Sequence, residues 1–203
     1  MNLSVIRNTQ LMSGITQRYV FKDEEFILSK VSYPEKIKEV GALRIQAWKE
    51  EQGVSKAFFA NETWIDELDE NAHHWIISAS GHVVASARMS FHETYATVPH
   101  AELFDEKDLG KYNRGPFASL NRLVVDPLYR GKGFSSVLDE IRIEYARTNG
   151  IRNIIAQPIE NRIKPLEEMG FILFGKIRPL PQMPDRQLYF MINEIAENKN
   201  VEN

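Results

Sequence analysis

The chain has 203 residues, of which 43% are hydrophobic and 26% are charged, and it contains no cysteine. This composition is typical of a globular domain with a substantial core, and the absence of cysteine excludes disulfides and thiol nucleophiles. The net charge of −3 gives no overall positive field that would attract nucleic acid or anionic lipid.

We expect one domain over residues 1–203, with residues 1–24 as an N-terminal extension and residues 196–203 as a frayed tail. Residues 1–18 lack the apolar core of a signal peptide, and no segment is apolar for long enough to span a bilayer. The sequence therefore predicts a cytoplasmic protein that binds neither membrane nor nucleic acid. Its oligomeric state stays open, a homodimer included.

The first half of the chain predicts a strand, a helix, a hairpin and an irregular insertion. Pro34 is tolerated in a first helical turn, and apolar residues follow it at helical spacing toward Gly53. Ser80–Gly81 separates two apolar segments and indicates a tight hairpin turn. The elements are expected at 26–31 (strand), 34–53 (helix), 75–79 and 83–90 (hairpin) and 91–117 (insertion).

The second half predicts a β-turn-α-β unit followed by a helix and two strands. Leu123–Val125 is short, apolar and β-branched, as an interior strand is, and proline ends it at Asp126–Pro127. From Phe134 to Tyr145, apolar residues recur at helical spacing, and Gly150 follows as a stop. The later elements are expected at 151–156 (strand), within 160–169 (helix), and at 171–177 and 187–192 (strands).

The turn between this strand and helix carries the strongest functional signal. Gly131 and Gly133 let several backbone N–H groups converge near a helix N-terminus, which favours a phosphate or pyrophosphate. A Walker-type loop is excluded because Lys132 is followed by glycine rather than serine or threonine. A dinucleotide fingerprint fits poorly, since Ser136 stands at the third small position and Gln157 where an acidic residue is needed.

The segment Arg130-x-x-Gly133-x-Ser135 resembles the Arg/Gln-x-x-Gly-x-Gly/Ala loop of the GNAT N-acetyltransferase superfamily, with serine as a small departure at the last position. Gly170–Phe171 after a short helix, and the hairpin that ends near Arg88, also resemble that family, and the similarity spans about residues 25–192. It implies an α/β (α+β) fold, with a mixed central sheet of six to seven strands and helices on both faces.

In that family the loop wraps the pyrophosphate of coenzyme A, and the preceding strand holds the pantetheine arm at a bulge. The resemblance therefore implies acetyl-CoA as the acyl donor. Asn161, at the head of the penultimate helix, matches a family contact, although a helix cap is an equal alternative. The donor-binding residues implied are Leu123, Val124, Val125, Arg130, Gly131, Lys132, Gly133, Phe134, Ser135, Ser136 and Asn161.

The catalytic acid and base are open. Many family members have a tyrosine three or four residues before Gly-Phe, where this chain has Leu166. Candidates for the general base are Glu93, His92 and Glu160, which are titratable and near expected strand ends, and none of them is preferred over a solvated loop residue.

The acidic segment from Asp66 to Glu70 and the pair His73–His74 do not have the spacing of an EF-hand or a zinc helix, so no metal site is expected. Asp66-x-x-Asp69, followed later by Arg88, instead resembles a pattern before the hairpin in some GNAT enzymes, and is also similar to GNAT-fold acyl-homoserine-lactone and N-acyl-amino-acid synthases. Solvated acidic residues before a strand are the alternative. Phe58–Phe59 either packs in the core or lines an acyl pocket.

The resemblance implies an N-acyltransferase that moves an acetyl group to a primary amine, by direct attack in a ternary complex. The acceptor is a small molecule or a peptide. One alternative is an N-acyl-amino-acid or acyl-homoserine-lactone type synthase that uses a longer acyl donor. A second alternative is a sensor that binds acyl-CoA without turnover.

Overall fold

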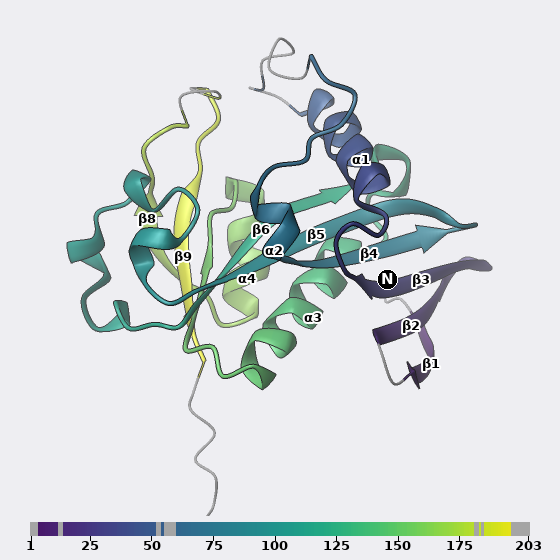
Figure 1. The fold of residues 1–203 in the computed structure, drawn as a ribbon, viewed down its shortest axis with the longest axis horizontal. Helices are drawn as coiled ribbons and strands as arrows, with labels where there is room; N and C mark the ends of the chain where they lie inside the picture. Colours follow the sequence, from purple (N-terminus) through teal and green to yellow (C-terminus); the bar gives the residue numbers. More distant parts are fainter. Residues whose placement is uncertain are drawn as a thin grey trace, which may run out of the picture.

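A computed structural model describes residues 4–11, 14–51, 54, 60–180, 183 and 185–195, and these residues form one nine-stranded sheet with helices around it (Figure 1). The strands lie in the order β1-β2-β3-β4-β5-β6-β7-β9-β8. Their bounds are β1 Ser4–Leu11, β2 Gly14–Phe21, β3 Glu24–Val31, β4 His73–Ala79, β5 His82–His92, β6 Phe117–Val125, β7 Asn153–Ala156, β8 Ile172–Lys176 and β9 Tyr189–Glu194. The helices are α1 Ile37–Lys49, α2 Leu68–Asn71, α3 Phe134–Thr148 and α4 Ile163–Glu168.

The sheet is mixed, as predicted. Strands β1 to β6 pair antiparallel with their sequence neighbours, whereas β6 and β7 are parallel and are connected through α3. The expected number of six to seven strands was too low. Residues 4–21, expected as an extension, form the hairpin β1–β2, which adds two strands at the edge of β3. The predicted tail, residues 196–203, lies outside the described residues.

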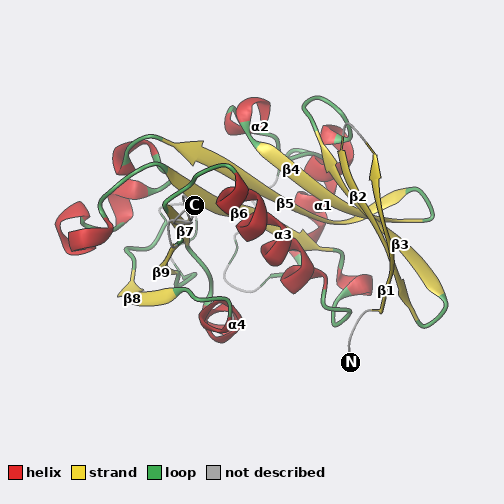
Figure 2. Ribbon diagram, turned by 90° about the horizontal axis from the view of Figure 1, so that it is seen from below, coloured by secondary structure: helices red, strands yellow, loops and turns green. Residues whose placement is uncertain are grey.

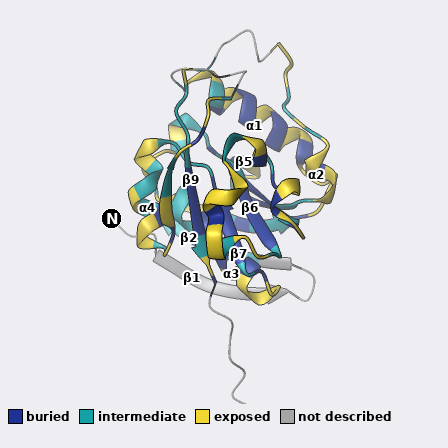
Figure 3. Cartoon of the chain, turned by 90° about the vertical axis from the view of Figure 1, so that its left-hand side faces the viewer, coloured by how far each residue is buried: buried dark blue, intermediate teal, exposed yellow. Residues whose placement is uncertain are grey.

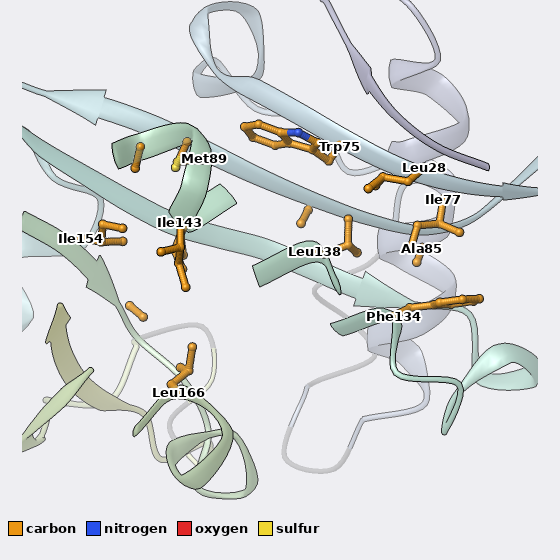
Figure 4. Close-up of a cluster of buried hydrophobic side chains, with 14 of the residues drawn as sticks. Leu28, Trp75, Ile77, Ala85, Met89, Phe134, Leu138, Ile143, Ile154 and Leu166 are labelled. Atoms are coloured by element: carbon orange, nitrogen blue, oxygen red, sulfur yellow. The ribbon is translucent and has the colours of Figure 1, made fainter. Parts of the chain in front are cut away.

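Helices cover both faces of the sheet, and Figure 2 shows α3 in front of the strands with α1 behind them. The alternation of side chains along β4 explains the two layers. Trp75 and Ile77 pack in the main core with Leu138 of α3, while Ile76 points to the other face and packs with Val40 of α1. Figure 4 shows the core beneath α3, and Figure 3 shows the central strands as buried.

Local backbone geometry sets the helix ends. Helix α3 begins at Phe134, as predicted, because Gly133 adopts a left-handed φ of 83° immediately before it. Helix α1 begins at Ile37 rather than near Pro34, because Lys36 has a φ of 57°, which a helix does not accommodate. The insertion at residues 91–117 is more regular than expected: it contains three 3₁₀ segments, at Tyr95–Thr97, Ala101–Leu103 and Glu106–Tyr112.

A buried ion-pair network attaches α1 and α2 to the sheet. Arg44 of α1 donates two hydrogen bonds to the carboxylate of Asp69 in α2, at 2.8 and 2.9 Å. Arg88 of β5 contacts the same carboxylate at 3.0 Å. The side chains of Arg44, Asp69 and Arg88 are at most 2% exposed. Three elements distant in sequence are therefore held by one carboxylate. Among the described residues, no helix has the length and apolar character needed to cross a membrane.

We predict that Asp69→Asn lowers the free energy of unfolding by about 3 kcal/mol, because it leaves buried guanidinium groups without their counter-charge. Urea denaturation at pH 7 measures this loss. The matched control is Glu70→Gln, an exposed neighbour in the same short helix, which should change the stability by less than about 0.5 kcal/mol. A similar stability for the two variants would contradict the role of Asp69.

The same network predicts a pH dependence of stability. Burial alone would raise the pKa of Asp69, but its hydrogen bonds and charge interactions with Arg44 and Arg88 lower it from 3.8 to about 2. The unfolded chain therefore binds more protons between these values, so the stabilisation is complete above pH 4 and is lost as the pH falls toward 2. Asp69→Asn should flatten the stability profile in this range.

Candidate functional site

The strands β6 and β7 separate in the middle of the sheet. Their parallel pairing ends at Leu120 and Ala156, and Pro158, which cannot donate to a strand ladder, follows soon after β7. On the other side of β6, the register with β5 shifts: β5 advances from Ser86 to Arg88 while β6 moves by one residue more, from Val124 to Asn121. This extra residue is a β-bulge, which bends β6 away from β7.

A cavity of about 870 Å³ occupies the space between the separated strands. The bulged strand β6 forms one wall, and the segment around α4 forms the opposite wall. The turn before α3 lies at one end, where Arg130 also reaches Ala47 and Glu51 at the end of α1, and the insertion lies at the other end. Representative lining residues are Leu123 and Val125 (β6), Asn161 and Leu166 (α4 side), Gly131 and Ser135 (turn), Trp48 (α1), and Trp64 and His100 (far end).

The turn before α3 presents unpaired backbone amides to this cavity. Gly131 and Gly133 adopt φ of 78° and 83°, a left-handed conformation that favours glycine. The first helical hydrogen bond runs from Val137 N to Gly133 O, so the amides of residues 134–136 have no partner within the helix. No side chain caps this end of α3. The helix dipole adds partial positive charge at the same point, so the turn is suited to an anion.

All the residues predicted to bind the donor line the cavity, with the exception of Lys132. The Lys132 ammonium lies 3.3 Å from Glu24 and stacks over the rings of Phe21 and Phe26. Its side chain is therefore engaged with β2 and β3 and points away from the cavity. Arg130 lines the cavity and forms an ion pair with Glu51 at 2.9 Å.

The side chains of Leu123, Val124 and Val125 pack against the core, and their backbone runs along the cavity. Val124 packs with Leu43 and Ala47 of α1, while Leu123 and Val125 pack against the main core. Beyond Leu120, no strand in the described part of the chain pairs with the edge of β6 that faced β7. Asn121 O accepts a hydrogen bond from Arg142, whereas the edge at residues 123–125 has no strand partner there and can bind an extended ligand.

The wall opposite β6 contains two residues that the sequence analysis discussed, Asn161 and Leu166. Asn161 lies in a 3₁₀ turn at residues 160–162 and lines the cavity, and its side chain caps neither this turn nor α4, so the helix-cap interpretation was wrong. Leu166 is 3% exposed and also lines the cavity. An aliphatic side chain therefore occupies the position at which many family members have an acidic hydroxyl.

None of the three candidates for the general base belongs to the described residues that line the cavity. His92 is buried and its Nε2 lies 2.8 Å from Ser90 Oγ. Glu93 is exposed elsewhere, and Glu160 is exposed at a separate hollow beside Arg130. The sequence could not show this, because His92 ends β5 and Glu93 begins an insertion that has no periodic pattern to define its path.

The far end of the cavity contains polar residues that the sequence analysis did not select. The guanidinium carbon of Arg122 lies 3.7 Å from the ring centre of Trp64 and 5.8 Å from that of Trp48. Arg122 Nη2 donates to Asp66 at 2.7 Å, and His100 lies on the same wall. Arg122 follows Asn121 within β6, and this polar pair between apolar residues is the sequence signal for the bulge. Arg122 has a φ of 52°, which is unusual for a residue with a side chain.

Burial and neighbouring charges together set the protonation states of Asp66, Arg122 and His100. Burial would raise the pKa of Asp66, but hydrogen bonding to Arg88 and the charge of Arg122 lower it below 3.8. Burial lowers the pKa of Arg122 to about 10, so it stays charged at neutral pH. Partial burial lowers the pKa of His100 below 6.5, an effect that Glu102 opposes and that Arg122 and Arg88 reinforce. His100 is therefore neutral at pH 7 and able to accept a proton.

The acidic segment before β4 is paired with arginine side chains. Asp66 and Asp69 contact Arg88, Arg122 and Arg44. In the part of the chain that the structure describes, no group of three or more histidine or carboxylate side chains is arranged to hold a metal ion. Phe58–Phe59 lies outside the described residues.

Comparison with known proteins identifies the family. The family model for the acetyltransferase (GNAT) family matches residues 39–171. A search of curated protein sequences gives no significant match.

Three solved structures illustrate the likeness of fold. FeeM, an N-acyl amino acid synthase from uncultured soil microbes, has a TM-score of 0.65 at 11% identity, covering 85% of this chain and 92% of that one. BjaI, a CoA-dependent acyl-homoserine lactone synthase, has a TM-score of 0.63 at 16% identity, with 83% and 82% covered. A GNAT acetyltransferase from Streptococcus pneumoniae has a TM-score of 0.60 at 15% identity, with 84% and 99% covered.

Proposed function

The chain belongs to the GNAT acetyltransferase family and is an acyltransferase, and we propose that it moves an acetyl group from acetyl-CoA to a primary amine by direct attack in a ternary complex. One observation carries the proposal: a single cavity extends from the amide-rich turn, along the unpaired edge of β6, to an end with a neutral histidine. A donor and an acceptor can therefore approach from opposite ends and meet beside the bulge.

In this proposal the turn binds the diphosphate of the donor. The free amides at the start of α3 and the Arg130 guanidinium supply hydrogen bonds and positive charge. The unpaired edge of β6 at residues 123–125 binds the pantetheine amides, and Asn161 contacts the donor from the opposite wall. A backbone N–H of this edge stabilises the developing oxyanion, an effect worth about 3 kcal/mol per donor.

The chemical step needs an amine that has lost its proton. We propose that His100 accepts this proton, because the imidazole is neutral at pH 7 and lies on the wall at the acceptor end. The amine nitrogen then bonds to the acyl carbon and the carbon–sulfur bond breaks. The leaving thiolate takes a proton from solvent, since Leu166 has no proton to give.

A melting-temperature measurement tests the proposed donor site. Acetyl-CoA should raise the melting temperature of the wild-type protein by linkage, and Gly133→Asp should abolish that rise. The variant strains a backbone with φ of 83° and adds negative charge where the diphosphate binds. The matched control is Leu128→Asp, which adds the same side chain at a position that is 85% exposed and outside the cavity. A full shift in Gly133→Asp would count against the assigned site.

Substitution of His100 tests its proposed role as the general base. His100→Gln should reduce kcat/KM about a hundredfold at pH 7. The wild-type enzyme should lose activity as the pH falls through the His100 pKa, below 6.5, because the protonated imidazole cannot accept a proton. The variant should lack this acidic limb of the profile. His82→Gln, at an exposed histidine outside the cavity, is the control. If the His100→Gln variant keeps the acidic limb of the pH–activity profile, His100 is not the general base.

A second candidate function is an N-acyl-amino-acid or acyl-homoserine-lactone type synthase with a longer acyl donor. The observation that favours it is the apolar lining of the cavity on the side of α4 and β9, where Leu166, Met183 and Leu188 lie. These side chains could cover an acyl chain that extends beyond two carbons.

A series of straight-chain acyl-CoA donors separates these two functions. We expect acetyl-CoA to have the highest kcat/KM, measured by thiol release with one amine. If the apolar side binds the acyl chain, kcat/KM should instead rise with length, by up to about fourfold per methylene, as expected for ~0.8 kcal/mol of burial. A monotonic rise in kcat/KM up to an eight-carbon acyl chain would contradict acetyl transfer and support the synthase function.

A further inference from the structure

The acceptor end of the cavity carries one unbalanced positive charge. Three guanidinium groups and two carboxylates form one connected set of ion pairs there. Both carboxylates stay ionised because the pKa of each is lowered, and the nearby histidines are neutral because burial lowers the pKa of each. The set is Arg44, Asp66, Asp69, Arg88 and Arg122.

The burial of these groups makes the imbalance significant. Arg44, Asp69 and Arg88 are at most 2% exposed, and Arg122 is 16% exposed. Glu102, near His100, is 72% exposed, so its charge is largely screened by water. An unpaired charge removed from water is unfavourable, so an anion at this position would be bound strongly.

Arg122 is the member of the set that faces the cavity with donors to spare. Its guanidinium stacks on Trp64 at 3.7 Å, which fixes the plane of the group. Asp66 accepts from Nη2, and among the described residues no other hydrogen bond to this guanidinium is found. A planar guanidinium with a free edge binds a carboxylate through two parallel hydrogen bonds.

Resting on the acyl transfer proposed above, we propose that the acceptor is a free α-amino acid and that Arg122 binds its carboxylate. Arg122 immediately precedes Leu123, on the strand edge assigned to the donor. A carboxylate bound to Arg122 places the α-amine one carbon away, between that edge and His100. His100 takes a proton from the ammonium group, the nitrogen bonds to the acyl carbon, and CoA leaves as a thiolate that solvent protonates.

Matched acceptors test the proposal directly. With acetyl-CoA, or with the acyl-CoA that gives the fastest turnover, thiol release is measured for a series of amino acids. Each is compared with its primary amide and with the amine that lacks the carboxyl group. We expect kcat/KM for the amino acid to exceed that for both neutral analogues by at least tenfold, mainly through KM.

Variants of Arg122 locate the recognition. Arg122→Gln should raise KM for the amino acid at least tenfold relative to KM for the two neutral analogues, so that the preference disappears. Arg122→Lys keeps the charge but loses the planar fork, and should retain part of the preference. The control is Arg114→Gln, at an exposed arginine outside the cavity, which should retain all of it. The thermal shift by acetyl-CoA, which Arg122 does not contact in this proposal, shows that each variant is folded.

The outcomes separate the two levels of the proposal. Equal turnover of amino acids and neutral amines, or a uniform loss with all three acceptors in Arg122→Gln, would overturn amino-acid recognition and leave acyl transfer standing. If acetyl-CoA still raises the melting temperature but none of the acceptors causes thiol release, acyl transfer and the amino-acid acceptor would be overturned together. If Arg122→Gln shows no acetyl-CoA shift, a full preference in Arg122→Lys would overturn the role of the guanidinium fork.

Discussion

The interruption of the sheet between β6 and β7 is the constraint on which the rest of this structure depends. A bulge on β6 and the end of β7 at Ala156 remove the pairing that a continuous sheet would have. The free edge of β6, the cavity and the opening toward the turn before α3 all follow from it. A buried, unpaired strand edge is costly in a protein without a ligand, since backbone amides need partners. The cavity gives water or an extended ligand access to these amides.

A second constraint is electrostatic, and it links stability to recognition. Asp69 holds Arg44 and Arg88 in the interior, and Asp66 holds Arg122 at the cavity wall. The same charges that attach α1 and α2 to the sheet leave one guanidinium in excess beside the acceptor end. Arg122 and Arg88 also reinforce the effect of burial, which lowers the pKa of His100. The stability of the helices and the charge of the proposed acceptor site are therefore coupled, so a substitution at either aspartate should affect both.

The proposed donor and acceptor ends differ in the groups they present. At the donor end, Gly131, Gly133 and the unpaired edge of β6 present backbone groups, and the side chains of Leu123 and Val124 serve the core. At the acceptor end, side chains from α1, β6 and the insertion converge, and their identity sets the chemistry. The fold is retained in solved structures at 11–16% identity, whereas a site built from side chains can change whenever those side chains change.

The sequence by itself determined the features that depend on local pattern. The turn with Gly131 and Gly133, the start of α3 and the mixed sheet follow from residue spacing and from backbone preferences that act over a few positions. The tertiary structure alone decided which titratable groups meet: it separated His92 and Glu160 from the cavity, directed Lys132 to Glu24, and brought His100 to Arg122. The reason is physical. Side chains that meet in the cavity come from segments distant in sequence, and their meeting depends on how layers pack, which local periodicity does not encode.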